Sequence, residues 1–407
     1  MTTAPAPLPS PKPLAAASAA FVVLVILVSA YLLGQAPGTG GRQSFALLAG
    51  AAFGIALQRG RFCFLCNLRD LTREGDPRGA LAILVALGFG AIGYAAVFGA
   101  WLPNPFGGRL PPTAHIGPVG PALAVAAFVF GVGMAISGSC LSAHLYRLGE
   151  GSPTSPFALV GALGGFALGF STWNAIYVAA IAEAPAVWLP ASLGYPGALL
   201  LTLAALLALA VLALRLGRAI PSEPATPLTA KGLAAAVFNK RWPFLPAGLA
   251  VGAIATLYYL RVAPLGVTAE LGSLARTAAA SAGALPTTLH GLDGLRGCAT
   301  AVKETLLSDN GLFVVGLVAA SFSAALVSGR FRPALPTSGQ AARGLIGGVL
   351  MGWGAMTGLG CTVGVLLSGV HAGALSGWIF LVACVAGALT ADRVTALLAA
   401  AGRPRAV

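Results

Sequence analysis

Five of the six cysteines in this sequence stand near glycine, serine or arginine at the ends of apolar segments. They are Cys63, Cys66, Cys140, Cys298 and Cys361. A thiol is a weak S–H donor, so a row of thiols in a narrow path can bind a soft, polarizable anion without holding it tightly. These five cysteines are therefore predicted to line a substrate path. The sixth, Cys384, lies within an apolar segment, where cysteine packs as a small hydrophobic residue.

The cysteines recur at matching places in the two halves of the chain. Gly131–Cys140 aligns without gaps to Gly352–Cys361, and Arg61–Cys63 aligns to Arg296–Cys298. Cysteine is rare here, so two matches at the same offsets indicate a repeat more strongly than the shared glycines do. Glycines permit unwound backbone whose free N–H groups attract anions, although close helix packing would also explain any one of them. The other predicted path residues are Gly138, Ser139, Gly358, Gly360, and the two arginines that would draw in the anion, Arg61 and Arg296.

Other uses of these thiols fit the sequence less well. Structural disulfides form in oxidising compartments, whereas the repeat places the cysteines near the middle of a membrane. Cys63 and Cys66 have the Cys-x-x-Cys spacing of a metal site, but no second such pair or nearby histidine completes four ligands. We therefore expect no metal and no other cofactor. A membrane sulfurtransferase or thiol-redox protein that uses Cys63 and Cys66 is the alternative from another functional class.

The composition indicates that the elements around these residues lie in lipid. Hydrophobic residues make up 57% of the chain and charged residues 9%, whereas a soluble domain carries about 25% charged residues. Lys and Arg outnumber Asp and Glu by 24 to 11. Most of this excess is explained by basic loops retained on the cytoplasmic side of a membrane, and the remainder suits a path that attracts anions. We expect the lipid bilayer and a small anion as partners, and no nucleic acid.

Ten apolar segments predict an all-α polytopic integral membrane protein with about nine or ten transmembrane helices. They are Leu14–Leu33, Ala46–Leu57, Gly79–Trp101, Pro121–Ile136, Phe157–Phe170, Tyr195–Leu214, Pro246–Leu260, Leu312–Val327, Gly344–Met356 and Ala374–Leu389. Several are too short to cross a bilayer alone and end in glycine and cysteine. These short segments are predicted to be broken or re-entrant helices.

The segments fall into two membrane repeats. The predicted organisation is a disordered tail (1–13), a first repeat (14–220), a polar connector (221–244), a second repeat (245–393) and a basic tail (394–407). Four basic segments share the cytoplasmic side if Leu265–Pro286 does not cross the membrane. They are Arg59–Arg78, Arg215–Arg241, the pair Arg330 and Arg332, and the C-terminal tail. The two Arg–Cys segments then lie on opposite sides, so the repeats are predicted to be inverted and pseudo-symmetric.

Three segments resemble the cysteine motifs of the YeeE/YedE family of membrane proteins, whose characterised members take up thiosulfate. Gly54–Asp70 looks like the first motif, which ends in Arg-Asp, and Phe130–Gly151 looks like the second, with Leu-Tyr-Arg and Gly-Glu-Gly after its cysteine. Gly352–Gly369, continuing to Trp378, looks like the third. Together the motifs cover both halves of the chain.

The resemblance implies an hourglass-shaped helical fold in which Cys-bearing loops meet at a constriction. It also implies that Cys63, Cys140 and Cys361 pass thiosulfate along by transient S–H···S hydrogen bonds, and that a cytosolic sulfur-carrier protein receives it. The sequence departs from the family's Gly-Gly-Cys pattern at two positions: Ser139 replaces the second glycine before Cys140, and Leu359 replaces the first glycine before Cys361. It also has the bulky His144 where a small residue is common, and an extra thiol at Cys66.

The function predicted from these observations is a permease of the cell inner membrane, and not an enzyme. Its cargo is a small sulfur-containing anion, with thiosulfate as the first candidate. A selenium-containing anion or another sulfur species is the alternative, because some relatives are linked to selenium metabolism and because the motifs depart from the family pattern.

Overall fold

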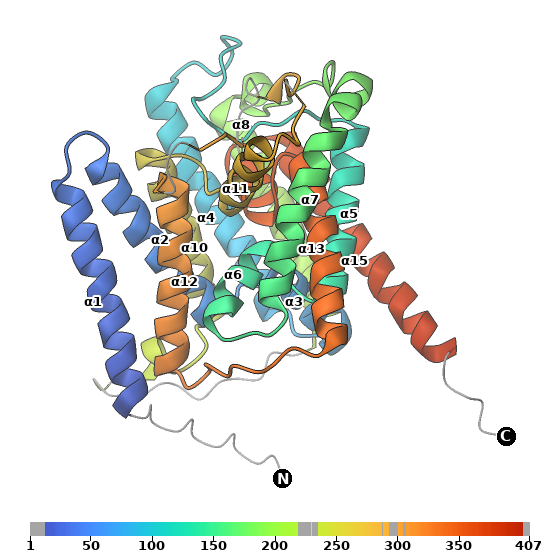
Figure 1. Cartoon of the computed structure of the whole chain (residues 1–407). Coiled ribbons are helices and arrows are strands. Elements are labelled where there is room, and N and C mark those ends of the chain that lie inside the picture. The colour runs from blue at the N-terminus through green and yellow to red at the C-terminus, as the bar shows by residue number, and fades with distance from the viewer. Residues whose placement is uncertain are drawn as a thin grey trace.

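The computed structural model describes residues 13–218, 229, 235–286, 288–292, 300–303 and 307–401. This part of the chain forms a bundle of helices (Figure 1). Along the chain these are α1 (Pro13–Gln35), α2 (Gly40–Gly60), α3 (Phe64–Arg69), the π-helical turn η1 (Asp70–Glu74), α4 (Arg78–Trp101), α5 (Pro121–Ser137), α6 (Leu141–Gly149), α7 (Ser155–Ile176), the π-helical turn η2 (Tyr177–Ile181) and α8 (Pro190–Leu216). They continue with α10 (Phe244–Arg261), α11 (Val267–Ser281), α12 (Asp309–Val327), α13 (Ser338–Thr357), the π-helical turn η4 (Thr362–Leu367), α14 (Ser368–His371) and α15 (Leu375–Ala401).

The helices have the length and the apolar surface of membrane-spanning segments. Within the described ranges, eight helices are long and apolar enough to span a bilayer, or nine if α13 and the η4–α14 segment, which are bent by 40°, count as one span. Large apolar side chains point outward, among them Leu200 and Leu207 of α8, which are 67% and 66% exposed. The predicted all-α, polytopic membrane fold is confirmed, and each of the ten apolar segments falls in a helix to within one residue.

Small residues let the central helices approach closely. α13 packs between α5 and α7, and a Cβ added to Gly352 of α13 would overlap the carbonyl oxygen of Ala162 in α7. On the other face of α13, Gly347 lies against Gly133 of α5, and Gly354 lies against Ala126. Residue numbers rise along one helix as they fall along the other, so α5 and α13 are antiparallel.

The basic loops gather at one end of the bundle, which is the lower end in Figure 1. Bonds between segments far apart in sequence hold them together: Arg218 N to Gly75 O at 2.7 Å, Trp242 N to Arg59 O at 3.0 Å, Arg332 N to Glu150 O at 3.1 Å, and Arg73 to Asp392 at 2.8 Å. We call this the basic end. α11 has 15 residues and is not one of the candidate spans. The placement of all basic loops on one side requires that the segment containing α11 does not cross the membrane.

Several predictions concern residues that the structure does not describe. The N-terminal tail up to residue 12 and residues 402–407 of the basic tail lie outside the described residues. Cys298 and Arg296, the proposed partners of Cys63 and Arg61 in the second half, lie outside the described residues, as does most of the connector. In the structure, the two halves can therefore be compared only at the segments around Cys140 and Cys361.

Candidate functional site

Three cysteines occupy the same local position, directly before a short helix that follows a break. Cys63 is the N-cap of α3, Cys140 of α6 and Cys361 of η4, and each side chain is at most 1% exposed. The sulfur of Cys63 accepts a hydrogen bond from the backbone N–H of Cys66, and that of Cys361 from Val363, both at 3.4 Å. A sulfur that accepts a capping bond in this way keeps its S–H free to donate.

The backbone turns in the same way before each cysteine. The residue two positions upstream has a left-handed conformation in all three: Arg61 (φ 49°), Gly138 (φ 89°) and Leu359 (φ 59°). A side chain in this region of φ/ψ space costs about 1–2 kcal/mol, so Arg61 and Leu359 are held there by the surrounding fold. Gly358, in contrast, has a φ of −86°, which any residue adopts.

The first two cysteine loops meet directly. The Cys63 thiol lies within hydrogen-bonding reach of the Cys140 thiol and of the backbone N–H of Cys140. In return, the Cys140 sulfur faces the backbone N–H of Phe64, the first residue of α3, and lies 3.4 Å from the Ser142 hydroxyl. Each loop therefore offers its backbone donor to the sulfur of the other.

Residues of the third loop share a cavity with the first two. The Cys361 thiol faces the Thr268 hydroxyl of α11. Residues that follow Cys361, namely Thr362 and Val363, line a cavity of about 20 Å³ together with Cys140 and Phe64. A space of this size holds about one water molecule, so the cavity beside Cys140 is closed to larger solutes in this conformation, and we call it the constriction.

A buried hydrogen-bond chain holds the Cys140 loop. The Ser137 hydroxyl donates to the carbonyl of Ser139 at 3.1 Å, and His144 Nε2 lies 3.1 Å from the same hydroxyl. Nε2–H therefore donates to Ser137, and Nδ1 accepts from the Ser155 hydroxyl at 3.1 Å. The bulky His144, which departs from the family pattern, thus has a structural role in this chain.

A larger cavity opens at the basic end. It measures about 310 Å³ and is lined by Arg61, Cys66, Asn67, Arg69, Asp70, Arg73, Glu74, Tyr146 and Arg147. We call this cavity the vestibule. Arg69 and Arg73 both pair with Asp392 of α15, at 2.5 and 2.8 Å. Within the described residues neither Arg61 nor Arg147 has a carboxylate partner, so these two guanidinium groups are available to an anion.

Cys66 connects the vestibule to the constriction. Arg147 donates a hydrogen bond to its sulfur at 3.1 Å, and the thiol lies 3.9 Å from the carbonyl oxygen of Gly138. Its thiol also lies within hydrogen-bonding reach of Cys63. Cys140, Cys63 and Cys66 are therefore neighbours in that order, and Cys66 is the one of them that lines the vestibule.

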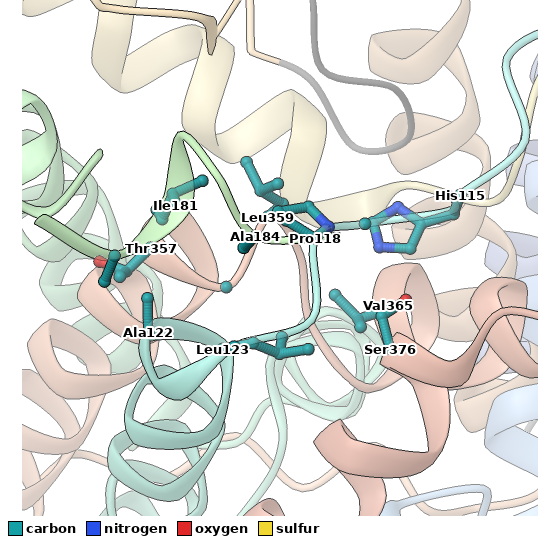
Figure 2. Close-up of a pocket in the computed structure, with 14 residues that line it drawn as sticks. His115, Pro118, Ala122, Leu123, Ile181, Ala184, Thr357, Leu359, Val365 and Ser376 are labelled. Atoms are coloured by element: carbon teal, nitrogen blue, oxygen red, sulfur yellow. The ribbon is translucent and has the colours of Figure 1, made fainter. Parts of the chain in front are cut away.

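A narrow cavity of about 10 Å³ reaches the Cys361 loop from the opposite end of the bundle (Figure 2). Leu359 and Thr357 before the cysteine and Val365 after it surround this cavity, together with His115 from the loop between α4 and α5. Gly358 also lines it. The ring of His115 is fully buried, and this burial lowers its pKa to about 4.

The structure thus brings together most of the predicted path residues. Cys63, Cys140, Cys361 and Cys66 lie in one region with Gly138, whereas Ser139 is buried and its hydroxyl has no hydrogen-bond partner among the described residues. Arg61 lies at the vestibule, and Gly360 is in the broken turn before Cys361. Cys384 packs within α15, where Gly131 of α5 lies against its carbonyl.

Three contributors were not among the predicted site residues. Arg147, Thr268 and Ser142 each contact a cysteine of the group. Arg147 and Ser142 lie close to Cys140 in sequence and could have been found by helical spacing from it. Thr268 comes from α11, more than 90 positions before Cys361, and no local pattern connects the two.

Comparisons with known proteins identify a family and several relatives of this chain. A family model described as sulphur transport matches residues 59–390. The thiosulfate transporter TsuA of Spirochaeta thermophila is 30% identical over 341 residues, which cover 82% of this chain and 93% of that protein. The thiosulfate transporter TsuA of Escherichia coli is 28% identical over 374 residues, covering 85% and 92%. The probable transporter YedE of E. coli is 28% identical over 106 residues, or 26% of this chain.

The family model covers most of the chain, including all three cysteine loops described above. The resemblance to the YeeE/YedE proteins is confirmed, and so is the expectation of a transporter and not an enzyme. The chain is a multi-pass membrane protein that belongs to the sulphur transport family.

Proposed function

We propose that this protein takes up thiosulfate, or a closely similar sulfur anion, across the inner membrane by way of its cysteines. The observation that carries the proposal is the placement of Cys63, Cys140 and Cys361, each buried and each directly before a short helix. Cys140 and the residues that follow Cys361 also line one small cavity. The similarity to two thiosulfate transporters over more than four fifths of the chain supports thiosulfate as the cargo.

The chemistry of the path suits a soft dianion. An anion that enters by the His115 cavity meets Cys361 first, then Cys140 and Cys63, and reaches the vestibule beside Cys66 and Arg147. Each S–H is a weak donor, and neighbouring backbone N–H groups add partial positive charge, so no single site traps the solute. The two guanidinium groups of the vestibule then attract the anion to the basic end.

The orientation of the protein in the membrane is inferred from charge. Loops rich in Arg and Lys stay on the cytoplasmic side, so the basic end is proposed to face the cytosol of a cell whose inner membrane holds the protein. A soluble sulfur-carrier protein would collect the cargo at the vestibule. The antiparallel packing of α5 and α13, with the same break before Cys140 and Cys361, supports an inverted relation of the two halves.

The test is uptake of radiolabelled thiosulfate by cells that lack other routes for it. Cells that express this protein should accumulate the label, with little competition from sulfate, because sulfate has no soft terminal sulfur. Excess selenite and sulfite measure the alternative cargoes. Stronger competition by selenite than by unlabelled thiosulfate would contradict the proposed cargo in favour of a selenium anion.

The cysteines are tested by substitution. Cys140→Ala and Cys361→Ala should abolish uptake although the proteins reach the membrane in normal amounts. Cys384→Ala is the matched control, because this equally buried thiol lies outside the path and its loss should leave uptake near the level of the unaltered protein. Normal uptake by both path variants would rule out the cysteine relay.

A further inference from the structure

Cys63 and Cys66 form a close dithiol that the relay alone does not require. Their side chains lie within hydrogen-bonding reach of each other, and both are free thiols. The backbone N–H of Cys66 donates to the sulfur of Cys63 at 3.4 Å, so the break before α3 turns both side chains to the same side. Two thiols held this close need little backbone movement to form a disulfide.

One of the two thiols is reachable from outside the membrane core. Cys66 is partly exposed and lines the vestibule of about 310 Å³, whereas Cys63 is completely buried behind it. Arg147 donates to the Cys66 sulfur at 3.1 Å, and its positive charge acts on both thiols and favours a thiolate in the Cys63–Cys66 pair. The thiolate is the form that attacks a disulfide, so Cys66 has both the access and the neighbour that thiol–disulfide exchange requires.

We propose that Cys63 and Cys66 form a redox-sensitive gate, a reversible disulfide made by exchange with a low-molecular-weight disulfide that enters the vestibule. The Cys66 thiolate attacks one sulfur of that molecule, forms a mixed disulfide and releases one thiolate. The Cys63 thiolate then attacks the Cys66 sulfur and releases the second. The two cysteines lose two electrons and two protons, and the small disulfide is reduced to two thiols.

The disulfide would close the path at Cys63. Cys63 lies between Cys140 and Cys66, and as half of a disulfide it has no S–H to donate to a passing anion. The transport effect therefore rests on the proposed function, whereas the disulfide itself does not. Of the two thiols next to Cys63, Cys140 is 1% exposed and lines the constriction, so Cys66 in the vestibule is the one that an incoming molecule meets.

The first experiment measures the disulfide directly and does not depend on the cargo. The purified full-length protein is incubated with oxidised glutathione, quenched with acid, alkylated and analysed by peptide mass spectrometry. A peptide with a Cys63–Cys66 bridge should accumulate and should disappear on treatment with dithiothreitol. Absence of this bridge, or a Cys63–Cys140 bridge in its place, overturns the proposal.

The second experiment measures the gate. Proteoliposomes are equilibrated with oxidised glutathione on both sides, and thiosulfate uptake by each variant is compared with its own rate before oxidation. The unaltered protein and Cys384→Ser should lose most of their uptake and regain it with dithiothreitol. Cys66→Ser, whatever its starting rate, should keep that rate after oxidation. Equal inhibition of Cys66→Ser and the unaltered protein overturns the gate.

The two experiments separate this proposal from the function it builds on. If untreated proteoliposomes take up no thiosulfate, the proposed cargo fails, while the mass spectrum still decides whether the dithiol is oxidised. If uptake is normal and oxidation forms the bridge without slowing transport, the cargo stands and the gate is overturned.

Discussion

Arg61 has two properties that substitution can separate, its left-handed backbone and its charge. It ends α2 at a φ of 49° and lines the vestibule, where it has no carboxylate partner among the described residues. Glycine adopts this conformation freely, whereas alanine does so at a cost of about 1 kcal/mol.

We predict that Arg61→Gly is more stable than Arg61→Ala by about 1 kcal/mol, because only glycine relieves the strain. Both variants lack the guanidinium, so both should need a higher thiosulfate concentration for half-maximal uptake. Thermal unfolding in detergent tests the first expectation, and concentration-dependent uptake tests the second. Unchanged uptake in both variants would show that the charge of Arg61 has no part in attracting the anion.

His115 provides a pH-dependent prediction at the far end of the molecule. Burial lowers its pKa from 6.5 to about 4, so between these values the unfolded chain binds a proton that the folded protein excludes. The free energy of unfolding should fall as the pH drops through this window, by about 3 kcal/mol from this residue.

The check is the melting temperature in detergent between neutral pH and the lower end of that window. His115→Gln, which cannot titrate, should lose less stability over the range than the unaltered protein. Parallel pH profiles for the two proteins would mean that His115 is protonated in the folded state or is solvated there.

At the scale of elements, the closeness of α13 to its neighbours decides where the Cys361 loop lies. Gly352 lies against the carbonyl of Ala162 in α7, whereas Gly164 of the same α7 has open space where a Cβ would go. The two positions make a matched pair, since both are glycines inside helices that pack together.

We predict that Gly352→Ala destabilises the protein by about 1–3 kcal/mol and reduces uptake, because the added methyl group forces α13 away from α7. Gly164→Ala should be neutral or stabilising by up to about 1 kcal/mol, because alanine is the better helix former. Melting temperatures and uptake rates of the two variants test this. Equal behaviour of the two would contradict the close packing of α13 on α7.

At the scale of the whole molecule, the basic end predicts the membrane topology. The loops held together by the Arg218–Gly75, Trp242–Arg59 and Arg332–Glu150 hydrogen bonds must share one side of the membrane. The positive-inside rule assigns that side to the cytosol.

A fluorescent protein fused to the C-terminal end should therefore fluoresce, because α15 runs toward the basic end (Figure 1). Alkaline phosphatase inserted after Gly108, in the loop between α4 and α5, should be active, because the proposed orientation places that loop in the periplasm. The reverse pattern of activities would invert the proposed direction of transport, although it would leave the arrangement of the cysteines intact.

Much of this molecule is determined by its sequence alone. The low charge and the apolar segments require a helical membrane protein, because unpaired backbone groups are too costly in lipid for any other structure built from such segments. Glycine one or two positions before a cysteine, at the ends of short segments, marked the breaks at Cys140 and Cys361, because glycine permits the turn that such a break needs. Charge in the loops predicted which of them lie together.

Only the tertiary structure decided which groups meet. The approach of Cys63 to Cys140, the contact of Thr268 with Cys361 and the donation from Arg147 to Cys66 join residues from different helices. Helix packing sets those distances through the summed fit of many side chains, and no window of sequence contains that sum. The left-handed turn at Leu359 is a further case, because local preference opposes it and the packed fold imposes it.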